Sequence, residues 1–469
     1  MKSVLRKNKF VVLFLITVLN LSPVLVKAAA SNSKKVNNTE AVSILKKYKI
    51  NPADVSLQIY NSHNEILNVN EKSKKIPASI SKLLTSLAVL KRFPPGHKFY
   101  TRLFYDGKNL YLKGGGDPSF VSESMWFLVN EFTRAGVKDI KGDIIVDDTL
   151  FDEVRYDESR ESTRVDRAYD SPVGAMSFNW NAVNIFVKPS ALGQKARVVV
   201  DPDNSYFDLV NNTNTVASPK KDLVATISNE NRLITVSGDV AQNAPEKAIF
   251  KSIENPAIWS GENLKFFLSQ RGIKLSGKVK TGVVSADAEQ VAVSESKNMA
   301  HIMADMNKFS NNYVAEMLTK GIAALDSDKK ASLSRGVEII REELKKIGLT
   351  ESDVIVKNPS GLTRDNSFSA TAMNKVLIEI KDDFSVYSTL VESLPIAGID
   401  GTLKRRFKNT KGEGWVRAKT GYLSGVVTLA GYAGRRNGDV LTFSFLYNGP
   451  REEAIVREAF DQVLLNSLQ

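Results

Sequence analysis

The sequence predicts an α+β protein whose main domain is interrupted by a long insertion. A helical pattern at 314–325 is followed by strand-like segments at 417–423, 426–434 and 440–447. Helices that precede an antiparallel sheet are typical of α+β domains. Residues 98–292 carry many short strand patterns instead, which indicates one or two mixed modules inserted into that domain. A chain of 469 residues, at about 150 residues per domain, fits two or three domains.

The N-terminus is typical of a cleavable secretory signal, in which cations precede an apolar run and small residues follow it. A membrane anchor is the alternative, but the apolar run Phe10–Val26 is short for a spanning helix and Asn20 interrupts it. We therefore expect residues 1–28 to be removed and the mature protein to lie outside the inner membrane, in the periplasm or cell envelope, without an integral membrane anchor. The cations are Lys2, Arg6, Lys7 and Lys9, and the small residues are Ala28, Ala29 and Ala30.

The composition excludes several kinds of site. The chain has no cysteine, so its stability must come from burial. Its three histidines, His63, His97 and His301, lie far from one another, which disfavours a Ser-His-Asp hydrolase and a histidine-rich zinc site. The net charge of +12 includes the signal cations and suits an anionic envelope polymer, or simply solubility.

The remaining elements follow from local patterns. Residues 55–70 alternate like a hairpin around 61–64, and Asn437-Gly438 predicts a two-residue turn between the last two strands. The final helix, around 454–468, lacks basic residues on its polar face and is expected to pack on the sheet. Within the insertion we expect strands at 109–112, 143–146, 196–200 and 233–236, and helices near 122–135 and 259–271.

The segment PASISKLLTSLAVL at 77–90 places a lysine in an apolar helix. Lysine is rarely buried unless it is paired or functional. Ser79 and Lys82 are three residues apart and hence on nearly the same side of the helix. The positive end of the helix dipole would stabilise an alkoxide at Ser79, and burial or a second cation would let the amine act as a base. The pair therefore predicts a serine nucleophile activated by lysine.

The spacing alone does not decide the matter, because Ser-x-x-Lys occurs elsewhere in the chain. Only the pair at 79 and 82 begins a deeply apolar helix, and the others are expected to be exposed. These are Ser31/Lys34, Ser43/Lys46, Ser218/Lys221, Ser294/Lys297 and Ser327/Lys330.

Two further motifs follow the first. The sequence SNN at 310–312 precedes a helix, where an N-cap is an equally good interpretation, and 62–64 and 177–179 share its pattern. The sequence KTG at 419–421 lies on a predicted strand, where a lysine can simply protect a sheet edge from aggregation. A second KTG at 280–282 precedes residue 310 and falls within the insertion, so it is expected to be a coincidence.

Serine-lysine, then serine-asparagine, then lysine-threonine-glycine is the order found in β-lactamases and penicillin-binding proteins. The chain resembles the low-molecular-mass class C penicillin-binding proteins, which are D-alanyl-D-alanine carboxypeptidases and endopeptidases with large insertions between the first two motifs. The 230 residues between Ser79 and Ser310 fit that class and exceed a typical β-lactamase. The segments that carry the resemblance are PASISKLLT at 77–85, LYLKGGGDP at 110–118, FSNNYVAEML at 309–318, NPSGLTRDN at 358–366, LPIAGIDGTLKRRF at 394–407 and RAKTGYLSG at 417–425.

The resemblance implies a role for each catalytic position. Ser79 attacks the carbonyl between two D-alanines and forms an acyl-enzyme, while Lys82 takes its proton. Ser310 relays a proton to the leaving amine, and Asn312 holds the substrate amide. Water then releases the peptide, with no cofactor and no metal.

The same resemblance implies a substrate-binding strand. Lys419 and Thr420 bind the terminal carboxylate, and Lys419 also helps to keep the base neutral. Gly421 belongs to this strand, and the backbone amide of Tyr422 completes an oxyanion hole with that of the nucleophile. Arg364, in the matching segment NPSGLTRDN, is a further candidate for substrate binding.

Three positions depart from the family pattern. Asn311 replaces the usual aspartate, and Ser81 stands where other residues are common. Tyr422 is bulkier than the usual serine or threonine and could narrow the cleft. The first two changes leave the reactive groups intact.

The implied fold is a penicillin-binding, serine β-lactamase-like transpeptidase domain built from 29–97 and 293–469. A smaller mixed α/β domain (98–182 and 246–292) and a β-rich domain (183–245) are inserted into it. The implied partners are peptidoglycan peptides and, as covalent inhibitors, β-lactam antibiotics. The basic run Lys404-Arg405-Arg406 is interpreted as a solvated loop and not as a nucleic-acid site, and GGGDP at 114–118 as a structural turn.

Three functional alternatives stay open at this point. A β-lactamase or an esterase would use the same serine, and would differ in how fast the acyl-enzyme is hydrolysed. A catalytically idle peptidoglycan-binding protein would lack a nucleophile, base or relay serine, yet all three are present. Whether terminal D-alanine or a cross-link is cleaved is not decided by the sequence.

Overall fold

The computed structural model of the chain describes residues 38–163, 166–326 and 330–468. The predicted signal peptide, 1–28, lies outside these residues. Among the helices of the described part, none combines the length and the apolar character that a bilayer span requires.

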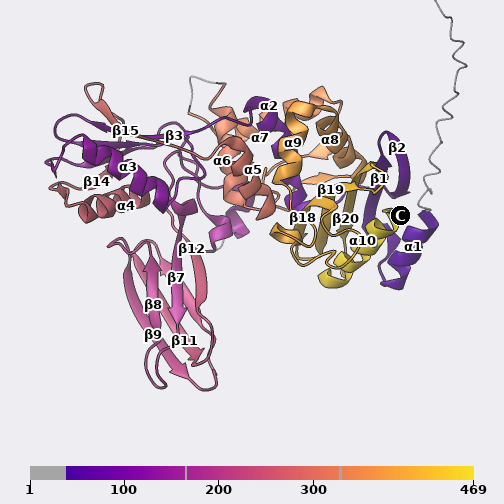
Figure 1. The fold of residues 1–469 in the computed structure, drawn as a ribbon, viewed down its shortest axis with the longest axis horizontal. Coiled ribbons are helices and arrows are strands. Elements are labelled where there is room, and N and C mark those ends of the chain that lie inside the picture. Colours follow the sequence, from indigo (N-terminus) through magenta and orange to yellow (C-terminus); the bar gives the residue numbers. More distant parts are fainter. Residues whose placement is uncertain (1–37, 164–165, 327–329, 469) are drawn as a thin grey trace, which may run out of the picture. The chain divides into compact units, whose positions relative to one another are not determined.

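A five-stranded antiparallel sheet joins the two ends of the described chain (Figure 1). The C-terminal strands and the predicted N-terminal hairpin lie side by side in it. The connection between its last two strands is longer than the predicted two-residue turn: pairing ends at Gly434 and Val440, and the amide of Arg435 donates to the carbonyl of Asp439 at 2.8 Å. The strand order is β18 (Val416–Leu423), β19 (Val426–Gly434), β20 (Val440–Asn448), β1 (Val55–Asn61) and β2 (Asn64–Val69).

Helices cover both faces of this sheet, and each face has its own apolar core (Figure 1). On one face α1 (Asn38–Lys47) and the predicted closing helix α10 (Glu453–Ser467) cover side chains such as Phe443 and Phe445. The other face carries α2 (Lys82–Arg92), α5 (Met299–Lys308), α6 (Asn312–Ala323), α7 (Leu333–Lys346), α8 (Ala370–Asp382) and α9 (Phe384–Ser393).

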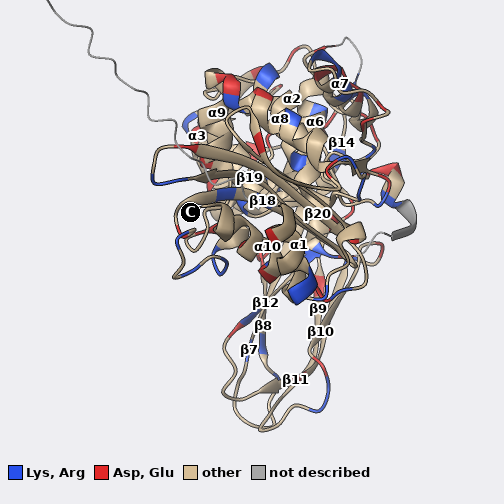
Figure 2. Cartoon of the chain, turned by 90° about the vertical axis from the view of Figure 1, so that its right-hand side faces the viewer, with Lys and Arg blue, Asp and Glu red and all other residues tan. Residues whose placement is uncertain are grey.

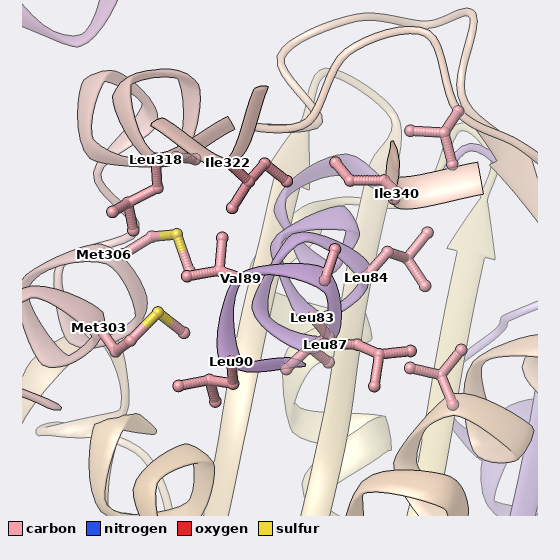
Figure 3. Packing of buried hydrophobic residues seen from close by; sticks show 14 of the residues in the cluster. Leu83, Leu84, Leu87, Val89, Leu90, Met303, Met306, Leu318, Ile322 and Ile340 are labelled. Carbon is pink, nitrogen blue, oxygen red and sulfur yellow. The ribbon is translucent and has the colours of Figure 1, made fainter. Parts of the chain in front are cut away.

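Helix α2 lies inside the second of these cores, as its sequence predicts (Figure 3). A short 3-10 turn, η2 (Ala78–Ser81), leads into it, so the α-helix itself begins at Lys82. Each fully buried leucine stabilises such a core by about 2 kcal/mol before conformational entropy is counted. Leu83, Leu84, Leu87, Val89 and Leu90 of α2 belong to the same cluster as Met303 and Met306 of α5, Leu318 and Ile322 of α6 and Ile340 of α7.

The insertion is built on a mixed five-stranded sheet and two three-stranded sheets. The first has the order β14 (Val279–Thr281), β6 (Ile144–Asp147), β4 (Leu110–Lys113), β3 (Tyr100–Tyr105), β15 (Glu289–Glu295). The others are β12 (Lys247–Ser252), β7 (Ala182–Lys188), β8 (Arg197–Asp201), and β10 (Val224–Ser228), β11 (Leu233–Ala241), β9 (Asp208–Val216). The insertion also contains two helices, α3 (Ser122–Arg134) and α4 (Pro256–Gln270), and the short strand pair β5 (Asp139–Ile140) and β13 (Lys274–Leu275). A second short pair, β16 (Val354–Ile355) and β17 (Ser367–Phe368), precedes α8 in the chain.

One apolar cluster runs through this whole insertion and contains residues of both predicted inserted modules, such as Ile234 and Trp259. The division of the insertion into 98–182 with 246–292, and 183–245, stays a prediction.

Candidate active site

The lysine of α2 is buried and points at the predicted nucleophile. Lys82 has no exposed surface, and its Nζ lies 3.1 Å from Ser79 Oγ. Two carbonyl oxygens also contact Nζ: Asn312 Oδ1 at 2.7 Å and the backbone oxygen of Ser360 at 2.6 Å. Those two atoms only accept hydrogen bonds. A neutral amine therefore donates its two hydrogens to them and turns its lone pair toward the serine hydroxyl.

Burial also favours that neutral amine. It lowers the pKa of Lys82 from the usual lysine range to about 7, although the charge of Glu316 acts in the opposite direction. A substantial fraction of the amine is then unprotonated near neutral pH, as a general base requires.

The residues of the second motif, 310–312, divide between helix capping and contacts with the candidate catalytic side chains. The side chain of Asn311 accepts a hydrogen bond from the amide of Val314 at 3.2 Å and so caps α6. The predicted N-cap is present, and Asn311 is the residue of the motif that provides it. The aspartate that is usual at this position would cap the helix in the same way. Ser310, with a φ of +57°, instead contacts Lys419, and Asn312 contacts Lys82.

The third motif lies on β18, an edge strand of the main sheet. Lys419 nevertheless has no exposed surface, and its Nζ donates to Ser310 Oγ and to the carbonyl of Thr420, both at 2.8 Å. Burial, followed by the charge of Lys82, lowers the pKa of Lys419 well below its usual range. The resemblance implied that Lys419 keeps Lys82 neutral; in the structure burial is the leading cause at Lys82.

The strand backbone lies close to the nucleophile. A Cβ at Gly421 would stand 3.0 Å from the backbone nitrogen of Ser79 and 2.2 Å from Thr428 Oγ1. Thr428 Oγ1 in turn donates to the carbonyl of Pro77 at 2.8 Å, which ties β19 to the turn that carries the serine. Only glycine permits this approach. Tyr422, the next residue, is 52% exposed, and its ring lies 5.7 Å from the guanidinium of Arg457 on α10.

The remaining predicted positions lie at the rim. Thr420 Oγ1 donates to Thr402 Oγ1 at 2.8 Å. Arg364 is exposed and donates to the carbonyl of Ser424, in the turn after β18, at 2.6 Å. Thr402 lies in the matching segment 394–407, where the sequence analysis assigned no role.

The segment NPSGLTRDN contributes more than Arg364. Asn358 Oδ1 accepts from the backbone amides of Ser360 and Leu362, which shapes the turn whose carbonyl holds the lysine. Asn366 Nδ2 donates to Ser81 Oγ at 3.0 Å, so the departure at Ser81 supplies a structural hydrogen bond. The sequence analysis missed these residues, and their only signal was the match of the whole segment.

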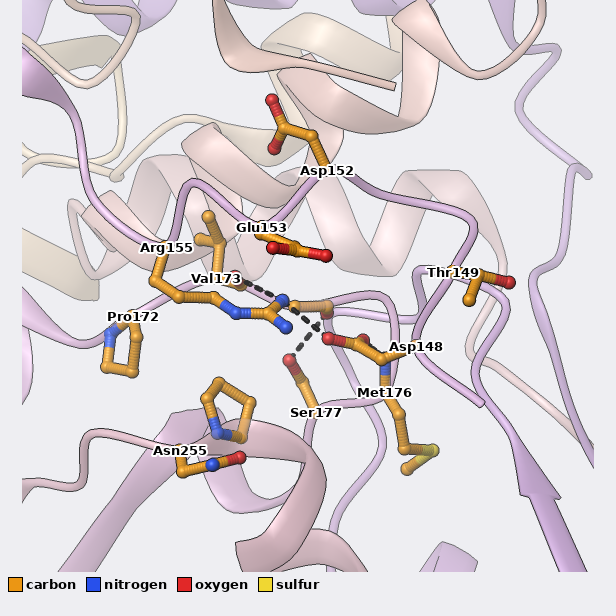
Figure 4. A network of polar contacts seen from close by, with 12 residues as sticks. Asp148, Thr149, Asp152, Glu153, Arg155, Pro172, Val173, Met176, Ser177 and Asn255 are labelled. Atoms are coloured by element: carbon orange, nitrogen blue, oxygen red, sulfur yellow. Dashed lines mark hydrogen bonds and ion pairs between the residues drawn. The ribbon is translucent and has the colours of Figure 1, made fainter. Parts of the chain in front are cut away.

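The inserted region reaches α6. The backbone carbonyl of Tyr169 accepts from Asn312 Nδ2 at 3.1 Å. Two turns further along the helix, Lys320 Nζ donates to Asp152 Oδ1 at 2.5 Å. Figure 4 shows how this part of the insertion is held, with Arg155 paired to the carboxylate of Asp148 at 2.5 Å.

The repeated motifs lie outside the pocket. Lys280 Nζ pairs with Asp143 at 2.6 Å, with 56% of its side chain exposed. Lys297 pairs with Asp305 at 3.0 Å, although Ser294 is buried and not exposed as expected. In the basic run, Arg406 pairs with Asp461. Lys404 and Arg405 are exposed, whereas the side chain of Arg406 is only 12% exposed. Figure 2 shows both basic and acidic residues spread over the ribbon.

Comparisons with known proteins identify the family of the chain. A sequence model of the D-Ala-D-Ala carboxypeptidase 3 (S13) family matches residues 41–466. The D-alanyl-D-alanine carboxypeptidase of Actinomadura sp. (strain R39) is 30% identical over 397 residues, which cover 80% of this chain and 73% of that protein. The D-alanyl-D-alanine carboxypeptidase DacB of Haemophilus influenzae is 26% identical over 410 residues, covering 83% and 84%.

Solved structures share the fold. Penicillin binding protein 4 from Haemophilus influenzae has a TM-score of 0.78 at 23% identity, covering 91% of this chain and 99% of that one. The same protein in complex with a β-lactam has a TM-score of 0.74 at 23% identity, covering 92% and 99%. A predatory peptidoglycan endopeptidase from Bdellovibrio bacteriovorus has a TM-score of 0.51 at 16% identity, covering 87% and 90%. The predicted penicillin-binding fold is thereby confirmed.

Proposed function

Because the chain belongs to the D-Ala-D-Ala carboxypeptidase 3 (S13) family, we propose that this serine hydrolase cleaves D-alanyl bonds of peptidoglycan stem peptides or cross-links through an acyl-enzyme on Ser79. The observation that carries the proposal is the environment of Lys82: a buried amine held by two carbonyl oxygens, with its remaining side facing the serine hydroxyl. That arrangement favours proton removal from Ser79 and needs no other base.

Acylation then proceeds as follows. Ser79 Oγ attacks the carbonyl carbon of the D-alanyl bond while its proton passes to Lys82 Nζ. The oxygen of the tetrahedral intermediate is held by the backbone amides of Ser79 and Tyr422, and one such donor is commonly worth about 3 kcal/mol of the barrier. The carbon–nitrogen bond breaks, and the leaving amine takes a proton through Ser310. An ester on Ser79 remains, which water hydrolyses to a free carboxylate and the original hydroxyl.

Substrate binding uses the other side of the pocket. The carboxylate of a terminal D-alanine binds Lys419 and Thr420, and its charge favours the protonated form of the lysine. The amide of the peptide binds Asn312, whose oxygen already contacts the base. We propose that the exposed side chain of Arg364 acts on a larger part of the substrate.

The structure of the Haemophilus influenzae relative with a β-lactam supports covalent inhibition of this site by such antibiotics. Their strained amide places a carbonyl where the D-alanyl bond lies. Action on peptidoglycan requires export, and the predicted signal at 1–28 provides it. We therefore propose the periplasm or cell envelope as the site of action.

The test uses purified mature protein, Ser79→Ala and the control Ser43→Ala, which alters an exposed Ser-x-x-Lys pair. Fluorescent penicillin should label the wild type and the control, and should not label Ser79→Ala. Uncross-linked and cross-linked muropeptides, digested and followed by mass spectrometry, distinguish carboxypeptidase from endopeptidase activity. Labelling of Ser79→Ala would refute the assignment, and rapid loss of the label from the wild type would indicate a β-lactamase.

A further inference from the structure

The carbonyl of Ser360 is itself held in place by a buried acid. The hydroxyl of Ser360 lies between two acceptors, 3.1 Å from Glu316 Oε1 and 2.6 Å from Asn358 Oδ1. Asn358 Nδ2 donates to the same oxygen of Glu316 at 3.3 Å, and Asn358 Oδ1 accepts from the amide of Ser360 at 2.9 Å. The residue that contacts Lys82 through its backbone is therefore held by Glu316 and Asn358 together.

Glu316 lies one turn after Asn312 on α6 and is 8% exposed. Asn312 supplies the other carbonyl oxygen that contacts the amine. Both acceptors of Lys82 thus depend on the same helix, one as part of it and the other through the carboxyl group of Glu316. A shift of this carboxyl group moves the carbonyl of Ser360 and with it the direction of the amine.

The charges around Glu316 come from several elements. Lys82 faces it from α2, and Lys419 lies beyond that lysine on β18. Asp157 approaches from the insertion and is 8% exposed, and Lys320 follows one turn later on α6. Burial, and then the charge of Asp157, raises the pKa of Glu316 to about 7, while the hydrogen bonds from Asn358 and Ser360 and the charge of Lys82 lower it.

We infer that Glu316 is a positioning residue that acts through Lys82: its carboxyl group helps to fix the carbonyl of Ser360 against the amine, and when ionised it opposes the loss of a proton from that amine. This inference rests on the proposed function, in which Lys82 is the base. An ionised Glu316 favours the ammonium form, which cannot accept the proton of Ser79. A protonated Glu316 keeps the hydrogen bonds and leaves the amine neutral.

The sign of the effect follows from this coupling. Glu316→Gln keeps a carbonyl oxygen for Ser360 and Asn358 but has no charge, so Lys82 loses its proton at a lower pH. Asp157→Asn removes the charge that opposes ionisation of Glu316, so the carboxylate forms more readily and Lys82 loses its proton at a higher pH. The asparagine retains the oxygen that accepts from the amide of Ser159 at 2.9 Å.

The experiment measures the second-order rate of acylation by fluorescent penicillin from about pH 5 to about pH 9. In each variant the acylation rate falls on the acidic side of the profile, and we call this part of the curve the acid limb. We expect the acid limb of Glu316→Gln to lie about one pH unit lower than that of the wild type, and the acid limb of Asp157→Asn to lie at a higher pH. Glu343→Gln is the matched control, since Glu343 is also a buried glutamate, 6% exposed, but pairs with Lys346 on α7. Its limb should coincide with that of the wild type.

The outcomes distinguish a failure of the proposed function from a failure of the inference about Glu316. A wild type that is not acylated at any pH overturns the proposed function. An acylated wild type whose acid limb does not move in Glu316→Gln overturns the inference alone, as does an equal shift in Glu343→Gln. If circular dichroism shows that Glu316→Gln does not fold, Asp157→Asn is used for the test instead. An acid limb of Asp157→Asn at the same pH as the wild type, or at a lower pH, overturns the inference.

Discussion

The tripeptide Lys-Thr-Gly occurs twice in this chain, and both copies lie on edge strands. Lys419, on β18, has no exposed surface and its Nζ contacts the hydroxyl of Ser310. Lys280, on β14, has 56% of its side chain exposed and pairs with the carboxylate of Asp143. The same tripeptide places its lysine in a buried site in one sheet and in a partly exposed ion pair in the other.

The difference lies in what covers each strand. One face of β18 packs against the turn that carries Ser79, where a Cβ at Gly421 would stand 3.0 Å from the backbone nitrogen of that serine, and Lys419 has no exposed surface. On β14 more than half of the lysine side chain is exposed, and its role in protecting the sheet edge stays a prediction. The reactivity of the lysine therefore depends on its burial and on the groups around it, and the tripeptide sequence alone does not determine either.

Removing each lysine should give the largest contrast. Lys419→Ala loses the cation that contacts Ser310 and the proposed carboxylate partner of the substrate, so acylation by penicillin should fall by about 100-fold or more. Lys280→Ala should acylate at the wild-type rate. Stopped-flow measurement with a fluorescent penicillin compares the two, and similar rates would remove the distinction between the sheets.

The pH dependence of the wild type sharpens the comparison, because only a desolvated lysine titrates near neutrality. Burial lowers the pKa of Lys82 to about 7, and the base must be neutral to accept a proton. Below that pH each unit should lower the acylation rate about tenfold, since the neutral fraction falls by that factor. A rate that stays constant down to about pH 5 would contradict a neutral lysine base.

The glycines of the two copies should differ as well. A Cβ at Gly421 would meet Thr428 Oγ1 at 2.2 Å and the backbone of Ser79 at 3.0 Å, whereas at Gly282 it would meet only the methyl end of Ile145 at 2.8 Å. Gly421→Ala should therefore slow acylation and lower the free energy of unfolding by about 1–3 kcal/mol. Gly282→Ala should change both less. Thermal unfolding together with the acylation assay checks this, and equal losses would refute the argument.

The smallest effect is expected at the ion pair of β14. Asp143→Asn removes one partner of an exposed pair, and such pairs contribute little to stability. The melting temperature and the acylation rate should both stay close to those of the wild type. A marked loss of either would show that the second copy is more than a surface feature.

The sequence predicted the reactive pair because a lysine in a deeply apolar helix conflicts with ordinary burial, and the structure places Lys82 beside Ser79. It also predicted the main sheet, since the alternation and the closing hairpin are local patterns. It left the role of the serine-asparagine motif open, because a cap and a catalytic turn share the same residues. Only the structure shows that Asn311 performs the capping alone.

The hydrogen bonds among Glu316, Asn358 and Ser360 could not be predicted from the sequence. Glu316 lies on a helix whose residues are all buried, but the sequence does not show which group it contacts. Ser360 acts through its backbone carbonyl, which any residue would have. Their meeting depends on packing between segments far apart in sequence. The pairing of the inserted strands has the same origin: β9 pairs in parallel with β11, and no periodicity within either strand encodes its neighbour.

The order of synthesis delays reactivity. The ribosome makes Ser79 and Lys82 early, but the amide of Asn312, the carbonyl of Ser360 and the amine of Lys419 are added only after the whole insertion. Before those segments are made, Lys82 lacks both of the carbonyl oxygens that contact its amine. A chain that stops before β18 also lacks Lys419, so its site is incomplete.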